Sequence, residues 1–308
     1  MEREPGNRLM SYAIGVDLGG TNIKVAVVSE DGEVLDRSAA ETADDATGSW
    51  AQTIKQKISE LENRRDQPSR WIGLAAPGLA AEDGLSIANM QGRLQGLERL
   101  DWTAFLQTSH PVPVLNDAHA ALLGESWKGA AAGYRQAVLL TLGTGVGGAI
   151  LADGHLFRGH IGRAGHFGHI SLNPDGPPDI VGTPGSLEQM IGNCTLAARS
   201  GGRFTLTRQL VEAHLEGDAE ATDIWLRSVY HLAAGILSII NAIDPEVIIL
   251  GGGIAQAGAA LFRPLECFLE KMEWRPQGHR VHIIPATLGD LAGTLGAAYY
   301  AMHWREMN

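Results

Sequence analysis

The stretch AIGVDLGGTNIKVAVV, residues 13–28, decides how the rest of this chain is interpreted. Two apolar, β-prone runs flank a turn that holds Asp17, Gly19, Gly20 and Thr21, so the stretch predicts an antiparallel hairpin. Glycines let the backbone approach a bulky anion, and the peptide N–H groups of such a turn can hold phosphate oxygens. Asp17 can hold a hydrated divalent cation beside them. The alternative is a hairpin whose aspartate and glycines serve turn geometry alone.

The length and net charge of the chain restrict the classes of protein to which it can belong. The 308 residues exceed what one core usually supports, so we expect two domains or one duplicated fold. A net charge of −11 disfavours nucleic-acid and anionic-membrane partners. No run approaches the roughly 18 apolar residues of a membrane span. We therefore expect a soluble cytoplasmic protein, in which Cys194 and Cys267 are small buried hydrophobes and form no bridge.

The first part of the chain alternates strands and helices. Apolar spacing after the hairpin predicts a third strand from residue 33, a helix over 49–61, a strand over 71–76, a loop over 79–101, a short helix over 102–108, a strand over 112–117 and a helix over 118–127. The strand at 112–117 ends on Asn116 and Asp117. Strand ends are where α/β sheets usually expose their chemistry.

The pattern of the first hairpin returns at AVLLTLGTGVGGAIL, residues 137–151. Two copies of a strand, a polar glycine turn and a second strand predict a duplicated fold. A third glycine turn, residues 251–253, follows the apolar strand 247–250. Three glycine turns at strand ends favour a nucleotide site, and neither a Walker loop nor a dinucleotide fingerprint accounts for them.

The segment 158–186 is a long glycine- and proline-rich loop that carries His160, His166 and His169. No cysteine lies near these histidines, so hydrogen bonding is a better interpretation than zinc binding. Thr183 and Pro184 are expected to be the N-cap and first residue of a helix that runs toward residue 199. Further expected elements are helices over 221–243, 261–272 and 291–301 and a strand over 281–285.

Asp117 is the best candidate for a catalytic base. Phosphoryl transfer to an alcohol needs a carboxylate within hydrogen-bond reach of the hydroxyl group. The alternative role is a helix cap, because aspartate caps well at a junction between strand and helix. The two roles do not exclude each other.

Five motifs in order resemble one known family. DLGGTNIK (17–24), NDAHA (116–120), TLGTGVGG (141–148), GHFGH (165–169) and ILGGG (249–253) resemble the ROK family of sugar kinases, within the actin/Hsp70/hexokinase-like superfamily. The resemblance covers nearly the whole chain. It implies an α/β fold of two actin-like (ribonuclease H-like) lobes, with mixed β-sheets flanked by helices and an active-site cleft between the lobes. The expected small lobe is 12–117 plus a C-terminal helix at about 290–308, and the larger lobe is 118–289.

The resemblance also implies an activity and its residues. It implies ATP- and Mg²⁺-dependent phosphorylation of a hexose, glucose or a close relative, at the C6 hydroxyl with Asp117 as the base, by a protein that is commonly a homodimer. The implied sugar ligands are Asn89, Asn116, Asp117, His166, His169 and Glu188. The implied ATP-binding residues are Asp17, Gly19, Gly20, Thr21, Gly143, Thr144, Gly145, Gly252 and Gly253, with Mg²⁺ near Asp17.

The chain departs from the family pattern at two places. His166 stands where the family has a glutamate, which exchanges an acceptor-only carboxylate for an imidazole. This keeps open an N-acetylhexosamine kinase, acting on N-acetylmannosamine or N-acetylglucosamine. The cysteines that hold zinc in many members are also absent from residues 179–188, so no structural zinc is expected. We expect Thr183 and Pro184 to rigidify this loop by capping the helix that presents Glu188.

A second alternative lies outside enzymes. The family also contains sugar-responsive transcriptional repressors. The acidic charge of the chain disfavours binding to DNA.

Overall fold

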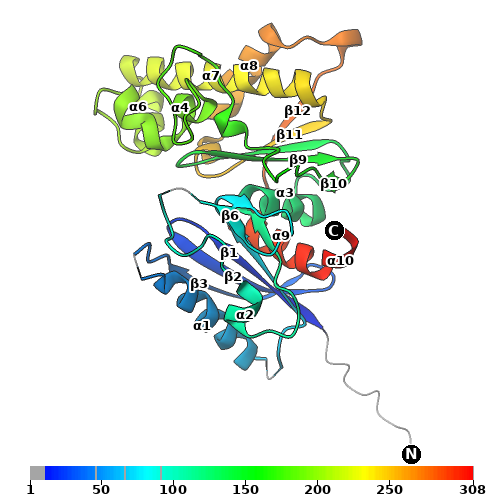
Figure 1. The fold of residues 1–308 in the computed structure, drawn as a ribbon. Helices are drawn as coiled ribbons and strands as arrows, with labels where there is room; N and C mark the ends of the chain where they lie inside the picture. The colour runs from blue at the N-terminus through cyan, green and yellow to red at the C-terminus, as the bar shows by residue number, and fades with distance from the viewer. Residues whose placement is uncertain (1–10, 46, 66, 91, 308) are drawn as a thin grey trace, which may run out of the picture. The chain divides into compact units, whose positions relative to one another are not determined.

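The computed structural model describes residues 11–45, 47–65, 67–90 and 92–307. It divides into two compact units, Met1–Lys128 with Asp290–Asn308, and Gly129–Gly289. Each unit contains a five-stranded sheet with helices packed on it (Figure 1). The sequence placed the division at Asp117, but helix α3 (Asp117–Lys128) packs against α9 (Ala292–Met302) of the first unit. The first unit therefore extends through Lys128.

The sheet of the first unit has the order β3-β2-β1-β4-β7. Strands β1 and β2 form the predicted hairpin, and β3 continues it antiparallel, whereas β4 and β7 run parallel to β1. The bounds are β1 (Tyr12–Leu18), β2 (Asn22–Ser29), β3 (Val34–Glu41), β4 (Trp71–Ala76) and β7 (Val114–Asn116).

The two faces of β1 are buried by different helices. Ile14, Val16 and Leu18 join the apolar core that also holds residues of α1 (Ser49–Asn63) and α2 (Trp102–Leu106). On the other face, a Cβ on Gly15 would lie 1.9 Å from the carbonyl oxygen of Thr294 in α9. Glycine is therefore required for the close approach of this helix to the strand.

The sheet of the second unit has the order β10-β9-β8-β11-β12. Taken in chain order within each unit, this is the same 3-2-1-4-5 arrangement as in the first sheet, with the same antiparallel and parallel pairs. The duplication expected from the repeated hairpin is thus present in the topology. The bounds are β8 (Ala137–Leu142), β9 (Val146–Ala152), β10 (His155–Leu156), β11 (Val247–Gly251) and β12 (His282–Pro285).

The helices of the second unit gather on one side of its sheet (Figure 1). Helix α7 (Ala219–Ile243) is long and apolar enough, by length and composition, to cross a membrane, which the sequence analysis did not anticipate. One such helix is weak evidence, because a core helix passes the same test. Trp225, Leu232 and Ile236 of α7 are fully buried in the core of this unit. The other helices are α4 (Leu187–Ile191), α5 (Leu196–Arg199), α6 (Thr207–Leu215) and α8 (Ala259–Met272).

Three local expectations were wrong. Helix α4 begins at Leu187 after Ser186, so Thr183 and Pro184 neither cap it nor start it. Cys194 and Cys267 form no bridge, but both are exposed and are not buried hydrophobes. Part of the loop expected over 79–101 forms a small two-stranded sheet of β5 (Leu79–Ala80) and β6 (Ile87–Asn89).

The packing of α3 against α9 generates a stability prediction for Gly296→Ala. The new Cβ would lie 1.7 Å from the carbonyl oxygen of Ala120. Alanine gains about 1 kcal/mol of helix propensity over glycine, but overpacking against backbone costs about 1–3 kcal/mol and sometimes more. We expect a net loss in the free energy of unfolding, measured by urea denaturation. Ser59→Ala on the exposed side of α1 is the control, and an unchanged or higher urea midpoint for Gly296→Ala would contradict the packing.

Candidate active site

The turn between β1 and β2 is held in shape by its neighbours in the first unit. The Gly19 N–H donates to the Asn22 carbonyl at 3.0 Å, and the Thr42 hydroxyl donates to the Gly19 carbonyl at 2.8 Å. The Arg93 guanidinium donates to the Gly20 carbonyl and to Asp44. Because these contacts hold the carbonyl groups of the turn, the backbone is fixed in one conformation.

Asp17 lies near the end of β1 in an acidic environment. Burial, together with the negative charge of Asp117, raises the pKa of Asp17 from 3.8 to about 7, and Lys24 opposes this rise. Lys24 is the cross-strand partner of Asp17 and forms an ion pair with Asp290 at 2.7 Å. A Cβ on Gly293, in the first turn of α9, would lie 2.7 Å from Cγ of Asp17. The carboxyl group therefore packs directly on a helix N-terminus, which favours negative charge.

Asp117 and Asn116 lie where β7 meets α3. The Asn116 side-chain oxygen accepts from the N–H groups of Ala118 and His119, so Asn116 is the residue that caps the helix. Asp117 is the first residue of α3, and its carboxylate accepts from the Ala118 N–H at 2.8 Å. Burial raises the pKa of Asp117, although its hydrogen bonds with Ala118 and Asn116 lower it in part. The raised pKa makes this carboxylate a stronger base.

The predicted residues of the first unit meet at one edge of its sheet. Asp17 pairs with Ala75 of β4, and Ala76 pairs with Asn116 of β7, so these strands end at the same level. The Asn116 amide donates to the Gly78 carbonyl at 3.0 Å, in the turn that follows β4. Asn89 is exposed at the end of β6, and its backbone packs on Gly78. Neighbouring turns at this edge therefore carry four of the predicted site residues, Asp17, Asn89, Asn116 and Asp117.

The glycine turns of the second unit also meet. Gly252 has a φ of 84°, and a Cβ there would lie 2.4 Å from the carbonyl oxygen of Leu142, the last residue of β8. Only glycine satisfies both conditions. The carbonyl groups of Gly143 and Thr144 accept from the N–H groups of Asn193 and Cys194. The predicted ATP-binding segments 143–145 and 252–253 thus lie together at the edge where β8 and β11 end.

Glu188 connects two of the predicted sites. It lies in the first turn of α4, and its Oε2 accepts from the Val146 N–H at 3.0 Å. A Cβ on Gly145 would lie 2.0 Å from the same oxygen. A predicted sugar ligand therefore packs on the predicted nucleotide turn.

The histidines of the long loop have different surroundings. Nδ1 of His169 lies 2.8 Å from Oδ2 of Asp179, a carboxylate whose side chain is 0% exposed. Nδ1 of His166 lies 3.1 Å from the Arg163 carbonyl, which can only accept, so this nitrogen carries the proton. Burial lowers the pKa of His166 below 6.5, so the ring is neutral at neutral pH. His160 is exposed in the same loop.

The loop residues do not fit a zinc site. Zinc prefers four ligands, mostly thiolate and imidazole. At this loop His169 faces a single carboxylate, and both oxygens of Asp179 accept hydrogen bonds from the protein. Within residues 11–45, 47–65, 67–90 and 92–307, no group of three or more His, Cys, Asp or Glu side chains is arranged to hold a metal ion.

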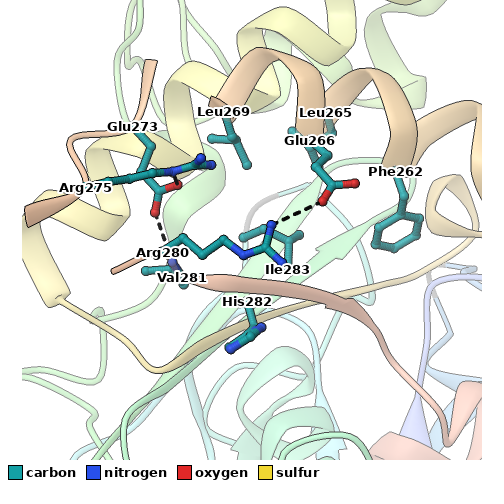
Figure 2. A pocket seen from close by; sticks show the side chains of 10 residues that line it. All are labelled: Phe262, Leu265, Glu266, Leu269, Glu273, Arg275, Arg280, Val281, His282 and Ile283. Atoms are coloured by element: carbon teal, nitrogen blue, oxygen red, sulfur yellow. Dashed lines mark hydrogen bonds and ion pairs between the residues drawn. The ribbon is translucent and has the colours of Figure 1, made fainter. Parts of the chain in front are cut away.

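A pocket in the second unit lies apart from all of these residues (Figure 2). It lies between α8 and the β12 region. Its charged groups are paired, Arg280 with Glu266 at 3.6 Å and Arg275 with Glu273 at 2.8 Å. None of the predicted site residues lines it.

Comparison with known proteins decides the family. A model of the ROK family matches residues 13–303. The chain belongs to the ROK family.

Relatives and solved structures agree with this membership. The glucokinase of Halalkalibacterium halodurans is 32% identical over an alignment of 319 residues, covering 94% of each protein. An N-acetylmannosamine kinase of Vibrio cholerae is 31% identical, over 93% of this chain and 98% of that protein. The structure of a ROK family glucokinase from Streptomyces griseus, in complex with glucose and AMPPNP, has a TM-score of 0.80 and 27% identity, covering 95% of this chain and all of that one. The predicted family and its α/β actin-like fold are confirmed.

Sequence reasoning missed three residues that shape the candidate site. Thr42 and Arg93 hold the β1–β2 turn, and Asp179 holds His169. The first two lie more than 20 residues from the turn, so no local pattern indicates them. Asp179 had a local signal, because an aspartate side chain in a turn often accepts from the backbone N–H two residues on, as Asp179 does from Val181.

The raised pKa of Asp17 predicts how stability depends on pH. A carboxyl group whose pKa is higher when folded binds its proton more tightly in the folded state, so stability falls as pH rises from about 4 to about 7. Asp17→Asn removes this loss. We expect the variant to gain stability over the wild type on the order of 2 kcal/mol as pH rises from 4.5 to 8, measured by urea unfolding. The exposed Asp31→Asn is the control, and a pH-independent difference for Asp17→Asn would refute the assignment.

Proposed function

We propose that this protein transfers the γ-phosphoryl group of ATP to the C6 hydroxyl of a hexose, with Asp117 as the general base. As a ROK family member with glucokinase relatives, the protein is an ATP-dependent sugar kinase. The hexose, the C6 position and the role of Asp117 are the parts that we propose. The observation that carries them is the half-buried Asp117 carboxylate at a strand end, next to Asn116 and electrostatically coupled to Asp17.

Asp117 is suited to accept a proton. Its raised pKa brings its basicity closer to neutral pH, which favours proton transfer from an alcohol in the transition state. Its hydrogen bond from the Ala118 N–H, at the start of α3, fixes the direction of the carboxylate. Asn116 uses its oxygen to cap α3 and one N–H to hold the Gly78 carbonyl, and its amide also hydrogen-bonds the Asp117 carboxylate. We propose that Asn116 mainly positions Asp117.

We propose that the phosphate groups of ATP are bound by the turns at residues 19–21 and 143–145, with Gly252 and Gly253 near the nucleoside. Asp17 fits a hydrated Mg²⁺, because Mg²⁺ is commonly held by one or two carboxylates together with phosphate groups and water. When bound, the ion would neutralise phosphate charge. A cation would also favour the ionised form of Asp17, whose pKa of about 7 leaves it partly protonated.

We propose that the sugar is bound by Asn89, His166, His169 and Glu188 together with Asn116 and Asp117. The neutral ring of His166 differs from a carboxylate in charge and shape, and so in the substituents beside which it can lie. This difference keeps open the alternative of an N-acetylhexosamine substrate, and separately a Vibrio cholerae relative at 31% identity is named for N-acetylmannosamine kinase activity. We place hexoses first because the relatives at 32% identity are glucokinases.

Asp117→Asn tests the proposed base. The amide keeps the shape of the carboxylate but cannot accept the hydroxyl proton, so we expect kcat to fall by about 10²–10⁴ while the KM values for sugar and ATP change little. Coupled ADP release with the best hexose is the measurement. The exposed Asp31→Asn should behave as the wild type, and circular dichroism should show that both variants are folded. A folded Asp117→Asn enzyme with near wild-type kcat would show that another group takes the proton.

A further inference from the structure

Asp179 is a buried carboxylate that is neither the proposed base nor one of the proposed sugar or ATP ligands. Its side chain is 0% exposed, although the segment around it is largely at the surface. Oδ1 accepts from the N–H groups of Val181 at 3.0 Å and Thr183 at 2.9 Å. Oδ2 lies 2.8 Å from Nδ1 of His169. One buried side chain thus joins two turns of its own loop to a residue ten positions earlier.

The contacts of Asp179 keep it ionised. Burial alone would raise the pKa of Asp179, but hydrogen bonds from His169 and from the N–H groups of Thr183 and Val181 outweigh burial and lower the pKa. An ionised carboxylate can only accept hydrogen bonds. Nδ1 of His169 must therefore carry a proton, so when the ring is neutral its acceptor nitrogen is Nε2.

The loop that Asp179 organises continues directly into α4. The Asp179 N–H donates to the Thr183 carbonyl, and the Gly182 N–H donates to the Asp179 carbonyl, which closes the turn. The Ser171 hydroxyl donates to the Pro184 carbonyl at 2.7 Å, and the Leu187 N–H donates to the Ile170 carbonyl at 2.9 Å. These bonds join both sides of the segment 170–187.

Two proposed sugar ligands lie at the ends of this network. His169 ends the 3₁₀ turn η1 (Phe167–His169), and Glu188 is the second residue of α4. A buried anion that holds both sides of the loop can fix the separation of these two side chains. The donor set here does not fit zinc, and hydrogen bonds to one carboxylate provide the connection that a metal centre would otherwise provide.

We propose that Asp179 is a positioning residue for sugar recognition. It fixes His169 as the Nδ1–H tautomer, with Nε2 available to accept from a sugar hydroxyl, and it holds the loop that presents Glu188 without a metal ion. This inference rests on the proposed function, because it takes His169 and Glu188 to be sugar ligands.

Asp179→Asn is the decisive variant. Its single side-chain oxygen retains the most bonds by accepting from Val181 and Thr183, which turns the NH₂ group toward His169. A donor opposite Nδ1 forces the proton to Nε2, so His169 becomes a donor where an acceptor is needed. We expect the KM for the sugar to rise about 5- to 100-fold, because the Nε2–H donor would then face the sugar hydroxyl that Nε2 accepts from in the wild type, and that bond is lost. The kcat and the KM for ATP should change little.

The control and a spectroscopic readout separate this role from a purely structural one. Asp175→Asn changes an exposed aspartate of the same loop and should leave every value unchanged. The ¹⁵N chemical shifts of the His169 ring, assigned with a His169→Gln variant, report the tautomer. We expect Nδ1–H in the wild-type protein and Nε2–H in Asp179→Asn. The wild-type spectrum reports the tautomer without any bound sugar.

The outcomes distinguish the two proposals. An Nε2–H tautomer in the wild type, an unchanged sugar KM in Asp179→Asn, or one zinc ion per chain that is lost in His169→Gln would overturn the role of Asp179. A wild-type protein that phosphorylates no sugar would refute the proposed function. In that case the ring shifts of the wild type and of Asp179→Asn still decide whether Asp179 fixes the tautomer.

Discussion

The register between parallel strands is the constraint on which the candidate site depends. In the first unit, β1 pairs with β4 and β4 pairs with β7 in a register that ends all three strands at one level. This brings Asp17 and Asp117 close enough for the charge of one to raise the pKa of the other. A shift of one residue would turn each side chain to the opposite face of the sheet. The pairing of the apolar strands thus determines how close Asp17 and Asp117 lie, and through this proximity it affects the pKa of Asp17.

The same constraint operates in the second unit through close backbone contact. Gly252 follows β11 and packs on the last residue of β8 in a conformation that only glycine adopts readily. The segment 143–145 is in turn held by Glu188 and by backbone groups of residues 193–194. The backbone conformation of these turns is therefore determined by their contacts with neighbouring segments. The amino-acid composition of the turns alone would permit several conformations.

Much of the fold was predictable because the relevant signals are local. The two hairpins follow from apolar runs around glycine turns, and Asn116 with Asp117 follows from a strand that runs into a helix. The start of α4 was not predictable in this way. Thr183 has the composition of a cap, but the buried Asp179 carboxylate takes its N–H, and the helix begins four residues later. The capping propensity of Thr183 is overridden here because the buried Asp179 carboxylate needs hydrogen bonds.

ADP release by the wild-type protein with ATP, compared across a panel of hexoses and N-acetylhexosamines, tests the proposed substrate class. We expect that a hexose gives the highest kcat/KM and that the product carries its phosphate on C6. A higher kcat/KM for N-acetylmannosamine or N-acetylglucosamine, or phosphate on another hydroxyl, would contradict it.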